Sequence, residues 1–172
     1  MHLPRELGNT VAVQLFKHVP WIGEQWARRR RFVEATSVPW APVVKRVKES
    51  SVALVTTAGV HLASDPAFDM VDADGDPGVR EIPGDVDPRL LTITHRYYDH
   101  WAADRDINVV LPLERLRELV DEGRVGAMAP RAFSFMGHID GRHLVTLMEQ
   151  TAPMVAERLR ADRAEAVFVT PA

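Results

Sequence analysis

The sequence predicts an α/β fold with a mostly parallel, doubly wound sheet, and two patterns lead to that prediction. Short runs of β-branched and apolar residues occur at 52–57, 90–94 and 166–170. Helical stripes of apolar residues lie between the last two runs, at 113–120 and 142–161. Strands that alternate with helices indicate βαβ units, which place strands in parallel. With 172 residues, 46% of them hydrophobic, the chain is long enough to bury its own core.

The chain is expected to begin with a helical arm over residues 1–38, followed by an α/β domain over 39–172. Apolar residues recur at near-helical spacing within 9–35. Pro20 is expected to kink or split this helix, because proline lacks the amide donor. Four consecutive arginines at 28–31 are interpreted as a solvated helix face.

The α/β domain opens with a strand at 52–57, whose nearly unbroken apolar run is typical of burial on both faces. Residues 58–61 are expected to turn away from its end, and 65–87 to form a polar loop with a short strand at 79–82. The remaining elements are a strand at 90–94, a polar loop at 97–108, a helix at 113–120 ended by Gly123, a short strand or turn at 124–129, a packed turn at 134–138, a helix over 142–161 with Pro153 inside it, and a strand at 166–170. This order is typical of Rossmann- or flavodoxin-like sheets.

Composition excludes several classes of function. A formal net charge of −3 gives no global attraction to nucleic acid or anionic lipid. No apolar run approaches the ~20 residues of a membrane span, and no signal-peptide pattern is present, so we expect a cytoplasmic protein. The absence of cysteine removes disulfides, thiolate metal sites and cysteine nucleophiles from this sequence.

Ligands of open parallel sheets bind where loops converge at the carboxyl ends of the strands. The first such loop offers the hydroxyls of Thr56 and Thr57, close backbone approach at Gly59, and a proton donor or acceptor in His61. The alternative is a threonine-rich strand end that caps its own turn. A third loop is expected after Thr170.

The second loop, 94–108, is dense in side chains suited to acid–base chemistry. Asp99 next to His100 could orient an imidazole, and His95 and Asn108 lie in the same stretch. A salt-bridged surface loop is the alternative. We expect no metal here, because a His-x4-His spacing matches no closed zinc pattern.

The acidic run 72–76 superficially suggests a calcium-binding loop. We reject that reading, because Pro77 stands where the required glycine belongs and Pro83 where the closing glutamate belongs.

Taken in order, several segments resemble the selenoprotein B family of glycine, sarcosine, betaine and D-proline reductases, above all its smaller D-proline reductase type. The resemblance covers about residues 39–171. The matching stretches are 52–62, 64–69, 75–77, 80–83, 98–100, 104–108, 112–119, Gly123 with Gly126, and 134–137.

The resemblance implies where a nucleophile belongs. In the family, a strand that ends in a Thr-Pro pair leads into a loop with selenocysteine or cysteine, and this chain has Thr170 and Pro171 followed by Ala172. The resemblance therefore implies a selenocysteine just beyond Ala172, encoded by an in-frame UGA, and a domain that is incomplete at its C-terminus. It also implies a pyruvoyl group on a partner subunit and no cofactor in this chain itself.

The resemblance further implies roles for the candidate residues. A substrate carboxylate would lie near Thr56, Thr57 and Gly59. Proton transfer falls to His61, His95, Asp99 and His100, and the remaining substrate-binding candidates are Asn108, Met136 and Gly137.

Three functions stay open. The first is a component of a reductase that cleaves a carbon–nitrogen bond in a small amino acid or betaine, together with other subunits, and is inactive alone. The second is a non-catalytic module that binds a small zwitterion. The third is a racemase-like enzyme with His61 and His100 as acid and base.

The last strand should also leave an exposed sheet edge. The arm, with Phe16, Trp21 and Trp26, is the expected homodimer contact.

Overall fold

The computed structural model describes residues 18, 19, 21, 24, 25, 28 and 40–172. Contacts divide the chain into two units, Met1–Val43 with Arg96–Asp99, and Val44–His95 with His100–Ala172. The second unit holds the sheet and is the one described below. The predicted helical arm, its arginine run and its dimer contact fall almost entirely outside the described residues and stay predictions.

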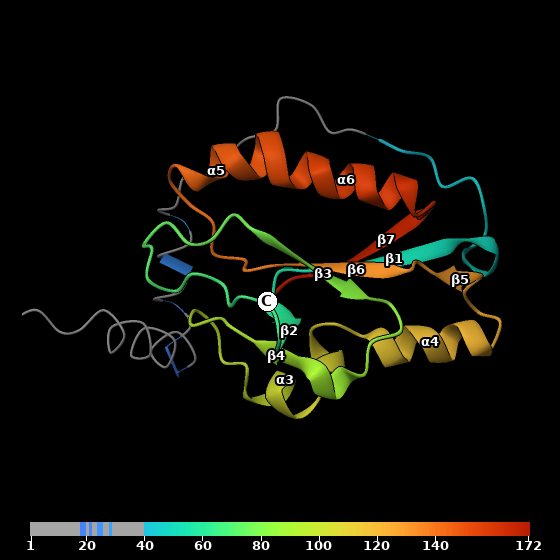
Figure 1. Ribbon diagram of the computed structural model, residues 1–172, viewed down its shortest axis with the longest axis horizontal. Helices are drawn as coiled ribbons and strands as arrows, with labels where there is room; N and C mark the ends of the chain where they lie inside the picture. The colour runs from blue at the N-terminus through green and yellow to red at the C-terminus, as the bar shows by residue number, and fades with distance from the viewer. Residues whose placement is uncertain (1–17, 20, 22–23, 26–27, 29–39) are drawn as a thin grey trace, which may run out of the picture. The chain divides into compact units, whose positions relative to one another are not determined.

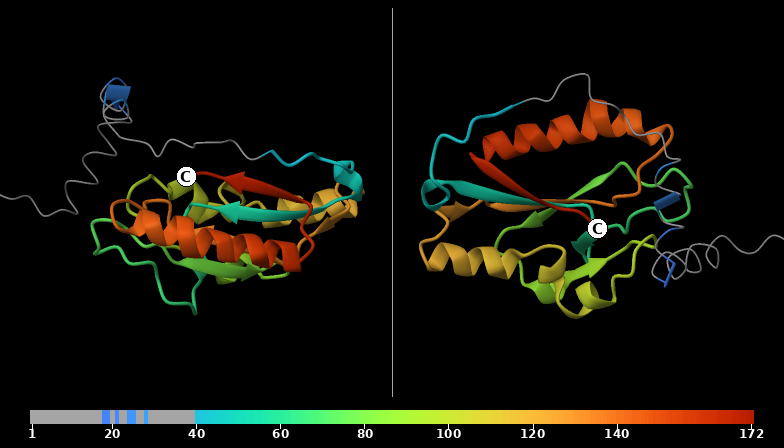
Figure 2. Two further views of the ribbon diagram at one scale, coloured as in Figure 1. Left: turned by 90° about the horizontal axis from the view of Figure 1, so that it is seen from above. Right: turned by 180° about the vertical axis from the view of Figure 1, so that it is seen from behind.

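The second unit is built on a five-stranded, mostly parallel sheet with β1 (Ser51–Thr56) at its centre. On one side β1 pairs in parallel with β7 (Ala166–Thr170) along its whole length. On the other side it pairs in parallel first with β5 (Ala127–Met128) and then with β6 (Arg131–Phe135). The outermost strand, β3 (Val79–Pro83), runs antiparallel to β6. Figures 1 and 2 show β7 beside β1, with the chain ending where these two strands end.

Two predictions from the sequence were wrong, and both concern a separate two-stranded sheet. Residues 58–61 were expected to form a turn, but Val60–Leu62 is a strand, β2. The strand at 90–94 exists as β4 (Leu91–Ile93), yet it pairs antiparallel with β2 and not within the main sheet. Both runs are too short for periodicity to reveal their partner, so only the tertiary fold decides it.

The observed helices agree more closely with those predicted from the sequence. Helix α4 (Leu113–Asp121) ends before Gly123, whose φ of +69° is the left-handed conformation typical of a helix end. The predicted helix over 142–161 is observed as α5 (His143–Thr146), a π-helical turn (Leu147–Thr151) and α6 (Ala152–Ala161). The π turn precedes Pro153, which cannot donate to the helix ladder.

The loop at 97–108 is more ordered than predicted. It contains helix α3 (Trp101–Arg105) and a 3₁₀ turn at Ile107–Val109. Two further 3₁₀ turns, Val47–Glu49 and Pro88–Leu90, precede β1 and β4. None of the helices among the described residues has the length and apolar character that crossing a bilayer needs.

Helices cover both faces of the main sheet (Figure 1). On the α6 face, Val155 packs against Phe133 and Phe135 of β6. The opposite side carries α4 with the β2–β4 pair and α3. The described unit is therefore a mixed α/β fold with a mostly parallel sheet, while the finer expectation of a Rossmann- or flavodoxin-like winding is not confirmed.

Strand β6 was missed by the sequence analysis. Residues 134–138 were predicted to be a packed turn, but Ser134 and Phe135 end a strand whose last four residues are all buried. Its Phe-Ser-Phe pattern alternates as a strand should, since the phenylalanines face α6 and the serine faces the other side. Five residues next to a proline gave too short a run to be recognised.

The expected exposed sheet edge is present. Within the part of the chain that the structure describes, β7 pairs only with β1. Its three central residues are exposed.

An ion-pair network fastens α6 to the β3–β6 pair. Arg131 donates two hydrogen bonds to the Asp162 carboxylate, at 2.6 and 2.8 Å, and one to Glu81 Oε2 at 2.7 Å. Arg158 of α6 also pairs with Glu81. Because the Arg131 bonds stabilise its charged form, the pKa of Asp162 is lowered.

Replacing Arg131 with alanine should lower the free energy of unfolding by about 2 kcal/mol, because the nearly buried Asp162 keeps its charge and loses its partner. Urea unfolding measures the change. As a control, Arg89→Ala removes a similar bidentate pair with the more exposed Asp87 and should lower the free energy of unfolding clearly less, because solvent screens this pair. Equal losses in the two variants would contradict the structural role of the network.

Candidate functional site

The carboxyl ends of β1 and β7 are tied together by the threonines that the sequence singled out. The Thr57 N–H donates to the Thr170 carbonyl at 3.1 Å, and Thr56 Oγ1 donates to the same oxygen at 3.3 Å. Thr57 Oγ1 in turn accepts a 3.1 Å bond from the Ala172 N–H. The chain that leaves β7 is therefore held against the end of β1.

Two glycines permit the backbones to approach closely at this end of the sheet. Gly137 has a φ of +83°, and a Cβ there would lie 2.4 Å from the Thr57 carbonyl oxygen and 3.3 Å from His95 Nε2. Gly59 has a φ of +69°, and a Cβ there would lie 2.5 Å from the Thr94 carbonyl oxygen. The positions after β1 and β6 thus require glycine for two reasons, conformation and space.

His95 lies inside this cluster. It follows β4, and only 6% of its surface is exposed. Burial, followed by the charges of His138 and His100, lowers its pKa from 6.5 to about 4, while a hydrogen bond to the Met136 backbone acts in the opposite direction. The imidazole is therefore neutral near pH 7 and can donate from one nitrogen and accept at the other.

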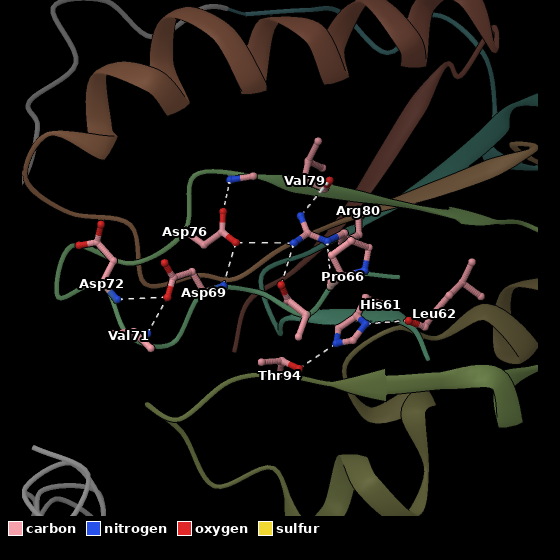
Figure 3. Close-up of polar contacts among 12 residues, drawn as sticks. His61, Leu62, Pro66, Asp69, Val71, Asp72, Asp76, Val79, Arg80 and Thr94 are labelled. Carbon is pink, nitrogen blue, oxygen red and sulfur yellow. Dashed lines mark hydrogen bonds and ion pairs between the residues drawn. The ribbon is translucent and has the colours of Figure 1, made fainter. Parts of the chain in front are cut away.

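His61 lies next to this cluster, but both of its ring nitrogens already have hydrogen-bond partners (Figure 3). Its Nδ1 lies 2.7 Å from the Leu62 carbonyl oxygen and its Nε2 2.8 Å from Thr94 Oγ1. Since a carbonyl only accepts, Nδ1 carries the proton and Nε2 accepts from the threonine hydroxyl. The ring is 3% exposed and stacks edge-on against Phe68, so the observed arrangement favours a positioning role.

The other predicted residues are distributed around this region. Met136 is fully buried next to Gly137. His100 precedes α3, and its Nδ1 lies 2.7 Å from Asp104. Asn108 is used structurally, since its amide group bonds Glu114 and its carbonyl oxygen accepts from the Glu114 N–H. Asp99 belongs to the other unit, which consists of Met1–Val43 and Arg96–Asp99.

The acidic loop is folded by its own carboxylates (Figure 3). Asp69 Oδ1 accepts from the Val71 and Asp72 N–H groups, and Asp76 accepts from the Asp69 and Gly78 N–H groups. Arg80 donates to the carbonyls of Pro66 and Ala67 and lies 4.2 Å from the Phe68 ring centroid. These carboxylates organise a loop.

Asp72 connects this loop to the start of α5. The Asp74 N–H, His143 and Arg142 all bond its carboxylate, which lowers its pKa to about 2. Among the residues that the structure describes, no group of three or more acidic or histidine side chains is arranged to hold a metal ion.

Two residues of this region were not identified as candidates from the sequence. Thr94, which begins the second loop but was not among the candidate residues, bonds His61 through its hydroxyl, and its N–H donates to the Gly59 carbonyl at 2.9 Å. His138 lies close enough to His95 to influence its charge. The signal for both was present, since each directly adjoins a predicted site residue, but β2 and β6 had to be recognised first.

A cavity of about 460 Å³ lies elsewhere, between β4 and α3, and is lined by Arg89, Thr92, Asp104 and Ile107 among others. It lies beside the second predicted loop.

The comparisons with known proteins agree on one protein family. The sequence model for "Glycine/sarcosine/betaine reductase selenoprotein B" matches residues 6–172. The D-proline reductase subunit gamma of Acetoanaerobium sticklandii is 37% identical over 140 residues, which cover 81% of this chain and 56% of that protein. No solved structure matches the chain.

Two more distant relatives are subunits of related complexes. The glycine reductase complex component B subunit gamma of Carboxydothermus hydrogenoformans is 27% identical over 77% of this chain and 30% of its own length. The betaine reductase complex component B subunit beta of Peptoclostridium acidaminophilum is 29% identical over 67% of this chain and 27% of its own length. The chain thus spans about half of the first relative and less than a third of the other two.

Gly137→Ala should be much more destabilising than Gly123→Ala, although both glycines have positive φ. A Cβ at Gly123 meets nothing within 4 Å, whereas at Gly137 it meets the Thr57 backbone. We expect losses of about 3 kcal/mol at Gly137 and about 1 kcal/mol at Gly123 in urea unfolding. Similar losses at both positions would show that the strand ends are not in close contact.

The stability of the chain should rise with pH between about 4 and 6.5, because the unfolded state binds a proton at His95 that the folded state excludes. The full contribution, up to about 3 kcal/mol, is present above pH 6.5 and is lost as the pH falls toward 4. Unfolding of a His95→Gln variant should show a flatter profile over this range. The exposed His18→Gln variant is the control, and identical profiles for all three proteins would refute the buried neutral imidazole.

Proposed function

The chain belongs to the glycine/sarcosine/betaine reductase selenoprotein B family, and we propose that it forms the pocket-bearing part of a reductase subunit. The proposed reaction is the reductive cleavage of a carbon–nitrogen bond in a small amino acid or betaine. Cleavage adds two electrons and two protons, so that carbon and nitrogen each gain a hydrogen, and a thiol-type reductant on a partner subunit supplies the electrons. The chain is proposed to be inactive alone and to work with other subunits in the cytoplasm.

The observation that carries the proposal is the hydrogen bond from the Ala172 N–H to Thr57 Oγ1. It ties Ala172 to Thr57, and Thr57 lies against Gly137 at the end of β1. This supports the proposal that a residue after Ala172 starts next to the cluster of Thr57, Gly137 and His95.

We propose that this residue is selenocysteine, encoded by an in-frame UGA codon. When present, its selenolate supplies the nucleophile. The residues at hand fit it, because the sequence contains no cysteine that could compete and the Ala172 N–H is already bonded to Thr57 at the strand end. A pyruvoyl group is proposed on a partner subunit, so this chain would bind, orient and exchange protons.

Within the pocket, Thr57 and Gly59 are proposed to lie next to the substrate carboxylate, with Gly137 and the buried Met136 shaping the opposite wall. Thr56 contributes indirectly, since its hydroxyl already bonds Thr170. His95 is the strongest candidate for proton exchange, because it is neutral and lies among the strand ends. His100, paired with Asp104, is proposed as an outer participant and Asn108 as a support of the loop, whereas a role for Asp99 rests on the family resemblance alone.

The racemase-like alternative is less well supported. It requires His61 and His100 as an acid–base pair, but both ring nitrogens of His61 are already bonded to Leu62 and Thr94. The zwitterion-binding module shares the pocket with the reductase and differs only in lacking the nucleophile.

The nucleotide sequence after the Ala172 codon separates the reductase from the binding module. We predict an in-frame UGA followed by a frame that continues to match the family. The purified 172-residue chain should show no turnover of D-proline, glycine, sarcosine or betaine with a dithiol reductant. An ordinary stop without a matching downstream frame, or robust turnover by the chain alone, would overturn the proposal.

A further inference from the structure

One short segment, residues 137–143, connects the proposed site with the acidic loop of residues 65–78. It begins at Gly137, where a Cβ would lie 2.4 Å from the Thr57 carbonyl oxygen and 3.3 Å from His95 Nε2. Gly137 therefore belongs to the wall around the His95 ring, and whatever fixes the segment also fixes that wall.

The far end of the segment is bound by one carboxylate of the acidic loop, that of Asp72 (Figure 3). His143 Nε2 lies 3.0 Å from Asp72 Oδ2, and Arg142 forms an ion pair with the same oxygen. The side chains of Asp72 and His143 are only 21% and 18% exposed, so solvent screens their contact little. Bonds from the Asp74 N–H, His143 and Arg142 lower the pKa of Asp72 to about 2, so the carboxylate is charged at neutral pH.

The acidic loop also holds the middle of the segment, through its backbone. The Asp140 N–H donates to the Asp74 carbonyl at 2.8 Å. A Cβ at Gly75, whose φ is +85°, would lie 1.7 Å from the His138 carbonyl oxygen, and Gly75 forms a β-bridge with Ile139. These backbone contacts align the two chains, and Asp72 adds the side-chain contacts that hold the end of the segment.

His138 links the same loop to His95. Its Nε2 lies 3.0 Å from the Ala73 carbonyl oxygen, and since a carbonyl only accepts, Nε2 carries a proton. After burial, the charge of His138 is the next cause that lowers the pKa of His95, ahead of that of His100. The acidic loop thus fixes a residue that acts directly on the His95 imidazole.

We propose that Asp72 is a positioning residue that acts on His95 through the segment 137–143. Its bonds to Arg142 and His143 hold the end of the segment, which keeps the wall around the His95 ring in place and excludes water from the ring. The inference rests on the proposed function, in which His95 exchanges a proton, and adds the residue that keeps this imidazole neutral.

The test is the pKa of His95 in the purified 172-residue chain and in its Asp72→Ala variant, measured by NMR from the imidazole signal that His95→Gln removes. Loss of the carboxylate should loosen the segment and admit water to the ring. The pKa of His95 should therefore rise from about 4 to about 5 or higher. The sign separates positioning from direct electrostatics, because removing a nearby negative charge by itself lowers the pKa of a histidine.

Two further variants complete the test. His143→Ala removes one of the bonds to Asp72 and should raise the pKa of His95 in the same direction but less. Adding it to Asp72→Ala should raise that pKa no further, because both changes break the same contact. Asp162→Ala is the matched control. It removes a carboxylate that Arg131 holds at the other end of β6, so it should lower the free energy of unfolding but leave the pKa of His95 unchanged.

Two results would overturn the positioning role. One is a His95 pKa that stays near 4 or falls in Asp72→Ala, and the other is an equal rise in Asp162→Ala. If Asp72→Ala does not fold, His143→Ala decides the question by the same criteria. Failure of the proposed function is a separate result, an ordinary stop after the Ala172 codon, which changes none of these pKa values.

Discussion

The structure depends on how closely the backbone packs where β1 ends. Strands β6 and β7 flank β1, and the segments that leave all three meet there. Gly137 lies against the Thr57 carbonyl, and the Thr57 amide bonds Thr170. Any side chain at Gly137 would separate these strands. The geometry that holds the sheet together therefore also brings the threonines, the glycines and His95 into one cluster.

The sequence was informative where burial alone determines the element. The four central residues of β1 are apolar because the strand is buried between two neighbours, and α4 carries a clear stripe of apolar residues that ends before Gly123. The sequence failed where tertiary pairing decides. Strand β6 is short and interrupted by polar residues, and β4 pairs with β2 and not with the main sheet. Local patterns contain no information about such partners.

The candidate site, like the fold, could be predicted from the sequence only in part. The rule that ligands bind at the carboxyl ends of parallel strands singled out Thr56 and Thr57, and the structure bonds both to Thr170. The rule could not reveal that Asn108 caps a helix or that Leu62 and Thr94 occupy both nitrogens of His61. Those outcomes depend on side-chain contacts across the fold, and they are the reason why His95 is the histidine proposed for proton exchange.

A two-dimensional amide NMR titration with D-proline, glycine, sarcosine and betaine tests most directly whether the strand ends form the ligand pocket. At least one of these compounds should produce its largest shifts at Thr57, Gly59 and Gly137. Shifts that cluster instead around the cavity lined by Thr92 and Ile107, or a spectrum that none of the four compounds changes, would contradict a pocket at the strand ends.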